Sequence, residues 1–484
     1  MLFDINRFNG KAIKLTSTAI NFIFSIVLGL IVPRYFGAET YGVYAYLIAT
    51  FTFIFQLFLF NSNTGYIYFL SENVFSNKEL NKLYAALFLT LSIVIITLTL
   101  FSINTDLGIK YLWNGFNDSN IILLAMLMIF LTTTQERLVE YSDCTEKTVQ
   151  TEFLKISSKV LLIIGVFVLI EIDQLSIESF ILLSILSLFT FVSIFFYVIK
   201  FEISFDFSYE AALIKDFLNY IKPLIFFSIV AALYTYLGKY VLQSSGGNIE
   251  QGYFLFAYQL SIIPVMFIAS LSTLYTKEII KKIEINRIDS VGDIFVLAST
   301  RIYTIHAFLS FFLLFNAKDI ILLTVGESFV DSAETLKFLC VFSLLHSFGM
   351  LSSSVFYASK RTKQYNLINS TIMAIGIGFY LFIYSYGSLN AVLLASFMTF
   401  TYFIRVLIQL LYNLSYMNLD KIVFFKKFIY PTFLTVFVVM LANQLSPNIV
   451  YNILIAVLGF LTINYLVRDQ IGIREFLGGL NGKR

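Results

Sequence analysis

Charged residues, cysteine and histidine are all scarce in this chain, and each shortage excludes a class of protein. Only 13% of the 484 residues are charged and 58% are hydrophobic, which leaves too little polar sequence to cover a water-exposed surface. The two cysteines (Cys144, Cys340) and the two histidines (His306, His346) are too few and too scattered to form a metal site. We therefore expect neither a metal nor a cofactor.

Two catalytic motifs are also missing. The sequence contains no Gly-x4-Gly-Lys-Ser/Thr phosphate loop and no Gly-x-Ser-x-Gly motif. The connections between its apolar segments are short, so they leave no room for a folded domain outside the membrane. We expect that the protein does not hydrolyse ATP itself, and that an ion gradient or the supply and removal of substrate drives any transport.

Long apolar stretches make up most of the chain, and about fourteen of them approach the ~20 residues that cross a bilayer. Backbone polar groups find no partner in hydrocarbon, and runs this uniformly apolar exclude the alternating pattern of a barrel. The predicted fold class is an all-α polytopic membrane protein with about 14 transmembrane helices. The approximate spans are 13–33, 42–62, 83–104, 119–135, 156–172, 177–199, 219–240, 253–276, 294–316, 335–357, 366–386, 388–412, 424–443 and 449–467.

Lys and Arg are distributed unevenly over the connections between these spans. When the amino terminus is placed inside, 26 of the 33 basic residues fall on its side of the membrane and five fall on the other side. The remaining two, Lys159 and Arg405, lie within spans. By the positive-inside rule, both termini are expected in the cytoplasm.

A short pattern recurs 210 residues apart, first as Gly37-Ala-Glu-Thr-Tyr-Gly42 and then as Gly247-Asn-Ile-Glu-Gln-Gly252. Both copies fall in an outer connection between the first two spans of a six-span set, which predicts internal duplication. The alternative is that a shared Gly-x4-Gly reflects loop chemistry only. Duplication predicts an N-terminal six-helix lobe at 1–200, a C-terminal six-helix lobe at 201–415, and an additional helix pair with a short cytoplasmic tail at 416–484.

Glycine and proline motifs along nearly the whole chain carry a family resemblance. They are Gly29-Leu-Ile-Val-Pro33-Arg34-Tyr35-Phe36-Gly37 with Tyr41-Gly42-Val-Tyr44, Gly252-Tyr253-Phe254 through Ile263-Pro264 and Leu274-Tyr275-Thr276-Lys277, Ala358-Ser-Lys-Arg361, and Tyr386-Gly387-Ser-Leu-Asn390-Ala391-Val392. These segments resemble polysaccharide flippases of the Wzx type, which belong to the multidrug/oligosaccharidyl-lipid/polysaccharide exporter (MOP) superfamily. The sequence departs from the family at Tyr275-Thr276, where a proline is usual.

This resemblance implies a non-enzymatic function. It predicts a V-shaped pair of lobes that moves a polyprenyl-pyrophosphate-linked oligosaccharide repeat unit from the cytoplasmic to the outer leaflet by alternating access. The implied partners are an undecaprenyl-pyrophosphate-type lipid-linked oligosaccharide and membrane lipids, with polysaccharide polymerase machinery as a candidate and no nucleic acid. The expected form is a monomer in the bacterial cytoplasmic (inner) membrane.

A pyrophosphate headgroup requires a cationic, hydrogen-bonding cavity, so basic and polar residues in or beside the spans are the candidate site residues. An Arg or Lys at a helix centre costs roughly 2.5 to 3.5 kcal/mol on insertion scales, so it is seldom kept without a role. The candidates for the substrate cavity are Arg405, Lys159, Arg301, His306, Lys14, Lys222, Arg34, Lys239 and Asn21.

Each of these candidates also has a structural interpretation. Arg405 could serve a buried carbonyl or carboxylate, Lys159 could extend to the cytoplasmic interface, and His306 could be a satisfied packing residue. The charges at span ends fit topology anchors. Serines and His346 in the tenth span could line a path for sugars or could pack helices together.

Two other functions remain open. A membrane-embedded polysaccharide polymerase or glycosyltransferase generally needs a large outer loop with acidic or arginine residues, and the largest outer connection here, about 317–334, is short. An ion-coupled drug antiporter of the same superfamily would need carboxylates within the membrane. Glu136, Glu140, Glu171 and Asp173 instead lie at span ends.

Overall fold

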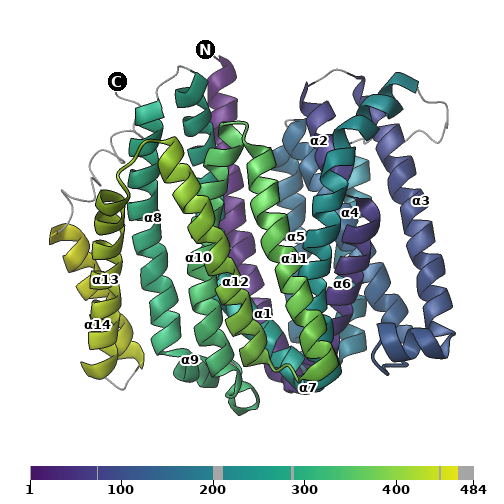
Figure 1. The fold of residues 1–484 in the computed structure, drawn as a ribbon. Coiled ribbons are helices and arrows are strands. Elements are labelled where there is room, and N and C mark those ends of the chain that lie inside the picture. The colour runs from purple at the N-terminus through teal and green to yellow at the C-terminus, as the bar shows by residue number, and fades with distance from the viewer. Residues whose placement is uncertain are drawn as a thin grey trace. The chain divides into compact units, whose positions relative to one another are not determined.

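The computed structural model describes residues 2–60, 62–72, 75–145, 147–199, 211–284, 288–445 and 449–466. Within these ranges the chain is built from helices and contains no strand (Figure 1). The predicted all-α fold class is confirmed.

The chain divides into two compact units. The N-terminal unit comprises residues 1–252 and 377–388. It contains α1 (Leu2–Leu59), α2 (Ser62–Glu72), α3 (Asn77–Ile103), the π-helical turn η1 (Gly108–Leu112), α4 (Ser119–Cys144), α5 (Thr148–Glu171), α6 (Ile177–Ile199) and the first part of α7 (Ala211–Glu284).

The C-terminal unit comprises residues 253–376 and 389–484. It contains the rest of α7, α8 (Ile288–Phe315), α9 (Ala317–Thr324), the 3-10 turn η2 (Glu327–Phe329), α10 (Ser332–Ala358), most of α11 (Thr362–Tyr386), α12 (Ala391–Tyr416), α13 (Lys421–Leu445) and α14 (Ile449–Leu466). The lobe boundaries at 200 and 415 stay predictions.

Eleven helical segments of the described residues are long and apolar enough to cross a membrane. Two of them, Ala19–Leu59 and Leu224–Met266, have 41 and 43 residues, about twice the ~20 that one crossing needs. A shorter apolar helix lies at Tyr451–Thr462. The total of about fourteen spans stays a prediction.

The two long segments each contain one backbone break, and the breaks fall on the first glycine of each sequence repeat. Gly37 has φ 70° and ψ 171°, and Gly247 has φ 71° and ψ −166°. Positive φ with extended ψ is accessible to glycine and strained for other residues. The spans predicted at 13–33 and 42–62 leave a loop between them, but the chain turns at Gly37 alone and is helical on both sides of it.

The second glycine of each repeat packs against the backbone of the other repeat. A Cβ atom on Gly42 would lie 1.7 Å from the carbonyl oxygen of Asn248, and one on Gly252 would lie 2.1 Å from the carbonyl oxygen of Ala38. The two contacts are equivalent under the 210-residue shift of the repeat. Because no side chain fits in either place, the Gly-x4-Gly pattern reflects a reciprocal helix contact and is more than loop chemistry.

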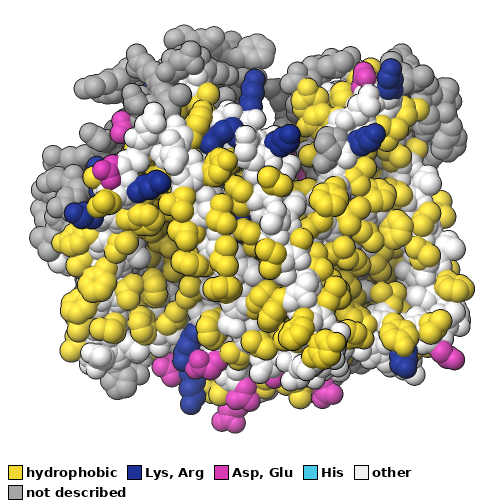
Figure 2. Space-filling view, in the orientation of Figure 1, with side chains coloured by type: hydrophobic (Ala, Val, Ile, Leu, Met, Phe, Trp, Pro, Cys, Tyr) yellow, Lys and Arg dark blue, Asp and Glu magenta, His cyan; other side chains and the backbone are white. Residues whose placement is uncertain are grey.

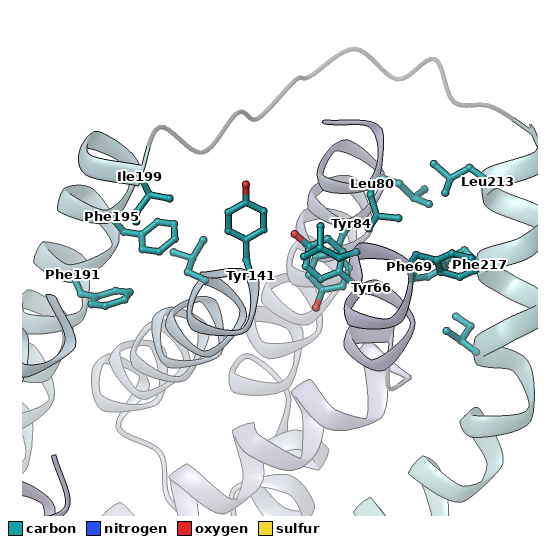
Figure 3. Packing of buried hydrophobic residues seen from close by; sticks show 14 of the residues in the cluster. Tyr66, Phe69, Leu80, Tyr84, Tyr141, Phe191, Phe195, Ile199, Leu213 and Phe217 are labelled. Carbon is teal, nitrogen blue, oxygen red and sulfur yellow. The ribbon is translucent and has the colours of Figure 1, made fainter. Parts of the chain in front are cut away.

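Aromatic packing in the N-terminal unit joins α2, α3, α4, α6 and the start of α7 (Figure 3). The rings of Tyr66 and Tyr84 stack with centroids 4.3 Å apart, and Phe69 lies beside Phe217 with centroids 6.1 Å apart. Burial raises the pKa of Tyr66, so its hydroxyl stays protonated and donates to Asn81 Oδ1 at 2.7 Å. Leu154 of α5 belongs to the same core, which fixes the ends of six helices against one another.

The core of the C-terminal unit joins the end of α7 to α8, α10, α12 and α13. Phe295 stacks on Phe424 with ring centroids 5.8 Å apart, and the ring centroids of Tyr303 and Phe428 lie 4.5 Å apart.

In Figure 2, hydrophobic side chains cover the middle of the visible helices, whereas Lys and Arg gather mainly toward their upper ends and Asp and Glu toward their lower ends. This distribution is typical of helices that span a bilayer.

Candidate functional site

Arg405 lies in α12, where its guanidinium forms a cation–π contact with an aromatic ring. The residue is 9% exposed, and its guanidinium carbon lies 3.8 Å from the centre of the Tyr402 ring. The Tyr402 hydroxyl lies 3.3 Å from Nδ1 of His346 on α10. Within the described part of the chain, Arg405 Nε has no hydrogen-bond partner and the guanidinium forms no ion pair. We refer to Arg405, Tyr402 and His346 as the arginine cluster.

Helix geometry explains this arrangement. Residues three apart share one face of a helix, so Tyr402 and Arg405 on α12 can meet without distortion. Gly349 lets α10 approach α12 closely, since a Cβ atom there would lie 3.3 Å from Val406 Cγ2 and 3.7 Å from Arg405 Nη2. A desolvated cation–π contact contributes about 2 kcal/mol, which supports the side chain without neutralising its charge.

His306 is enclosed between two helices and has partners on both ring nitrogens. Its Nε2 lies 2.9 Å from Ser343 Oγ, and its Nδ1 lies 2.9 Å from Ser347 Oγ. A neutral imidazole donates from one nitrogen and accepts at the other, so the two serine hydroxyls match it completely. This geometry favours the interpretation of His306 as a satisfied packing residue that joins α8 to α10.

Lys159 of α5 is turned toward α1. Its Nζ donates to the carbonyl oxygen of Asn21 at 3.1 Å and to the Ser25 hydroxyl. The neighbouring cation, Lys155, instead lies 3.6 Å from Glu152. The structure therefore brings together two predicted site residues, Lys159 and Asn21, and the Oδ1 atom of Asn21 is buried with no hydrogen-bond partner in the described residues. We refer to Lys159, Asn21 and Ser25 as the lysine cluster.

Three other predicted site residues, Arg34, Lys222 and Lys239, form no hydrogen bond or ion pair with either cluster in the part of the chain that the structure describes. Arg34 and Lys222 are exposed, and Lys239 is half-buried in α7. Lys14 and Arg301 fall on helices, but their side chains lie outside the described residues.

Three acidic side chains of α4 and α5 pair with a basic residue on their own helix. Near the end of α4, Glu140 Oε2 lies 2.6 Å from Arg137 Nη1, and Glu136 Oε2 lies 3.5 Å from Arg137 Nη2. Glu152 lies in the first turns of α5 and pairs with Lys155. No group of three or more His, Cys, Asp or Glu in the described residues could hold a metal ion. Thus Glu136, Glu140 and Glu152 each have a cation beside them.

Sequence reasoning missed Tyr402 and Gly349. In a chain with 18% aromatic residues, one tyrosine does not stand out, although its position three residues before an embedded arginine is a usable signal. It also left open whether the serines of the tenth span face a path or pack helices. Ser343 and Ser347 bind His306, and Ser352 Oγ accepts from Asn413 Nδ2 at 2.8 Å, so these three serve helix packing.

No protein-family model matches the sequence, and no curated protein matches it. Solved structures share its fold. The lipid II flippase MurJ in an inward closed conformation matches with a TM-score of 0.73 and 19% identity over 96% of this chain and 100% of that one. A multidrug resistance MATE family transporter of the MOP superfamily, in an inward-facing conformation, matches with a TM-score of 0.65 and 13% identity over 84% and 98% of the two chains.

A third similar structure is a MOP superfamily transporter from Pyrococcus furiosus, which is described as having a binding pocket of reverse polarity. It matches with a TM-score of 0.54 and 14% identity over 86% of this chain and 94% of that one. At these identities the likeness establishes the fold. The chain is a multi-pass membrane protein with the fold of the MOP superfamily transporters.

Proposed function

We propose that this protein is a flippase for a lipid-linked substrate with an anionic headgroup. In its specific form, the proposal is a Wzx-type flippase that moves a polyprenyl-pyrophosphate-linked oligosaccharide repeat unit to the outer leaflet by alternating access. The observation that carries it is the pair of embedded cations, Lys159 and Arg405, each held by neutral groups in the described structure. One lies in each unit of the chain.

The energetics of an unpaired cation support an anionic substrate. A cation within a span costs roughly 2.5 to 3.5 kcal/mol on insertion scales, and a carboxylate partner would offset that cost permanently. Arg405 has no such partner in the described residues, so a phosphate group could supply the missing charge when it binds. Arginine suits this role because its N–H groups match two oxygens of one phosphate.

The same observation weighs against the drug antiporter. Exchange of protons or sodium for a cationic drug needs carboxylates within the membrane, and Glu136, Glu140 and Glu152 of α4 and α5 are already paired with Arg137 or Lys155. The polymerase alternative needs a substantial outer loop. The connection at 316–331 consists of the two-turn helix α9 and the turn η2.

Two further observations support a lipid-linked substrate. The structure with the highest TM-score among those described above is a lipid II flippase, and the motifs around Gly37, Gly252 and Gly387 resemble polysaccharide flippases. The bacterial inner membrane, cytoplasmic termini, and an undecaprenyl-pyrophosphate-type oligosaccharide that is handed to polymerase machinery are parts of this proposal.

The proposal is tested by deleting the gene in its host and measuring which leaflet holds the lipid-linked oligosaccharide. We expect accumulation on the cytoplasmic side, rescue by the wild type, and no rescue by Arg405→Ala. The matched control is Lys337→Ala, which removes an exposed cation paired with Glu334 at 2.6 Å. If repeat units still reach the outer leaflet of the deletion strain and only polymerisation fails, the polymerase alternative replaces the flippase.

A further inference from the structure

A second cationic site lies at the far end of α12. A cavity of about 480 Å³ is lined there by Arg361, Lys421, Tyr412, Tyr416 and Ser415, together with two aliphatic side chains of α12. We call it the α12-end pocket. Tyr416 is eleven residues from Arg405, which is roughly 16 Å along the helix axis, so this pocket is separate from the arginine cluster.

Arg361 is held in a fixed orientation at the connection between α10 and α11. Its Nε donates to Ser359 Oγ at 2.9 Å, and its Nη2 donates to Asn413 Oδ1 at 3.0 Å. The guanidinium carbon lies 3.7 Å from the centre of the Tyr416 ring. Asn413 is itself fixed, because its Nδ2 donates to the carbonyl oxygen of Ser352 at 2.9 Å.

This bracing leaves donors available to a ligand. A guanidinium has five N–H groups, and the contacts of Arg361 in the described structure leave Nη1 without a hydrogen bond. Stacking on Tyr416 orients the guanidinium plane without consuming these N–H groups. The result is a pre-oriented fork that suits a phosphate better than a mobile surface arginine does.

The charge of the pocket is not compensated by its own lining. Lys421 supplies a second, exposed cation at the start of α13, and none of the lining residues is acidic. The adjacent carboxylate, Asp420, caps α13, where its Oδ1 accepts from the backbone N–H groups of Ile422 at 2.8 Å and Val423 at 3.1 Å. Two cations therefore face one cavity.

Polarity changes along the pocket in the way a phospholipid requires. Arg361, Lys421, Ser415 and Tyr416 lie at or beside the last turn of α12. Leu411 and Ile408 lie five and eight residues before Tyr416, about 7 to 12 Å further into the span, and Tyr412 lies beside Leu411. Basic pockets between helices at the membrane surface bind anionic headgroups. A detached phosphate would gain nothing from the aliphatic wall, whereas an acyl chain would cover it.

We propose that the α12-end pocket binds an anionic phospholipid, with the headgroup phosphate against Arg361 and Lys421 and an acyl chain along Ile408 and Leu411. This site is independent of the proposed transport substrate. It places a bound lipid against the junction of α10, α12 and α13 in the C-terminal unit.

The test is native mass spectrometry of the purified full chain titrated with phosphatidylglycerol or with phosphatidylcholine. For the wild type we expect about tenfold tighter binding of the anionic lipid at one site, as expected from two cations near a phosphate. The double variant Arg361→Gln/Lys421→Gln should bind both lipids equally. The control Lys363→Gln/Lys427→Gln removes the same charge from exposed positions outside the pocket and should keep the preference.

Three results would overturn the proposal: equal binding of both lipids by the wild type, a preserved preference in the double variant, or an equal loss in the control. Displacement of phosphatidylglycerol by millimolar inorganic phosphate would also overturn it, since the site would then take a free anion. Arg361 braces Asn413, so the double variant can lose its fold. The single variant Lys421→Glu leaves the Arg361–Asn413 contact intact and should abolish the preference for the anionic lipid. If the preference persists in this variant, the proposed lipid site is wrong.

Discussion

The lysine cluster and the arginine cluster hold an embedded cation by different means. Lys159 is surrounded by oxygen, from the Asn21 carbonyl and the Ser25 hydroxyl, and joins α5 to α1. Arg405 rests on the face of Tyr402, and its Nε finds no partner in the described structure. Oxygen ligands use the N–H groups of an ammonium, whereas a ring supports a guanidinium and leaves its N–H edge open. The difference indicates that Arg405 is the better placed of the two to bind a phosphate.

The largest effect is therefore expected from Arg405→Ala. Removing one partner of a desolvated charge pair costs about 2 to 5 kcal/mol, so the translocation rate should fall by roughly thirtyfold or more. Arg405→Lys should recover part of the rate, because it keeps the charge but loses the planar fork. The leaflet assay described above measures both variants. Near-normal transport by Arg405→Ala would remove the distinction between the two clusters.

A smaller loss is expected when Arg405 is kept but neutralised. A side chain added at Gly349 would begin 3.7 Å from Arg405 Nη2, so Gly349→Asp would place a carboxylate beside the guanidinium. A permanent counter-ion competes with the substrate phosphate. Because the new carboxylate would lie within hydrogen-bonding distance of Arg405, the transport rate should fall about tenfold. Gly349→Asn has the same shape and no charge, so it should stay close to wild type. If the two variants lose equal activity, crowding against Val406 is the cause.

Lys159→Met should have a more moderate effect. The Asn21 carbonyl keeps the Ser25 hydroxyl as a donor at 2.8 Å, so the free energy of unfolding should change by less than about 1 kcal/mol and the melting temperature should change little. A fall of a few-fold in transport at unchanged stability would give Lys159 a part in attracting the substrate. Transport at the wild-type rate would leave it as a purely structural link between α1 and α5. Thermal unfolding in detergent and the leaflet assay separate these outcomes.

The smallest effect on transport is expected at His306. Ser343→Ala or Ser347→Ala leaves one buried ring nitrogen without a partner, which should destabilise the protein by about 1 to 3 kcal/mol. The transport rate per folded molecule should not change. Thermal unfolding together with surface-normalised transport checks this. A rate that falls while the melting temperature holds would return His306 to the list of cavity residues.

Much of the candidate site could be located from the sequence, but its partners could not. Arg405 and Lys159 were identifiable because a basic residue within an apolar run is costly and therefore conspicuous. Nothing in the sequence pairs Lys159 with Asn21, which is 138 residues away, or His346 with Tyr402, which is 56 residues away. The two glycine turns were recognised by their repeat, although their helical form was not expected.

By itself, the sequence determined that this protein is a bundle of membrane-spanning helices. Lipid offers the backbone no hydrogen bonds, so the N–H and C=O groups of a long apolar run must bond to one another within a helix. Only the tertiary structure decided which neutral groups surround each embedded cation, and that Gly42 and Gly252 meet the opposite repeat's backbone. Helix contacts in a bilayer arise from shape and close packing between similarly apolar surfaces, so residue type alone does not specify which faces meet.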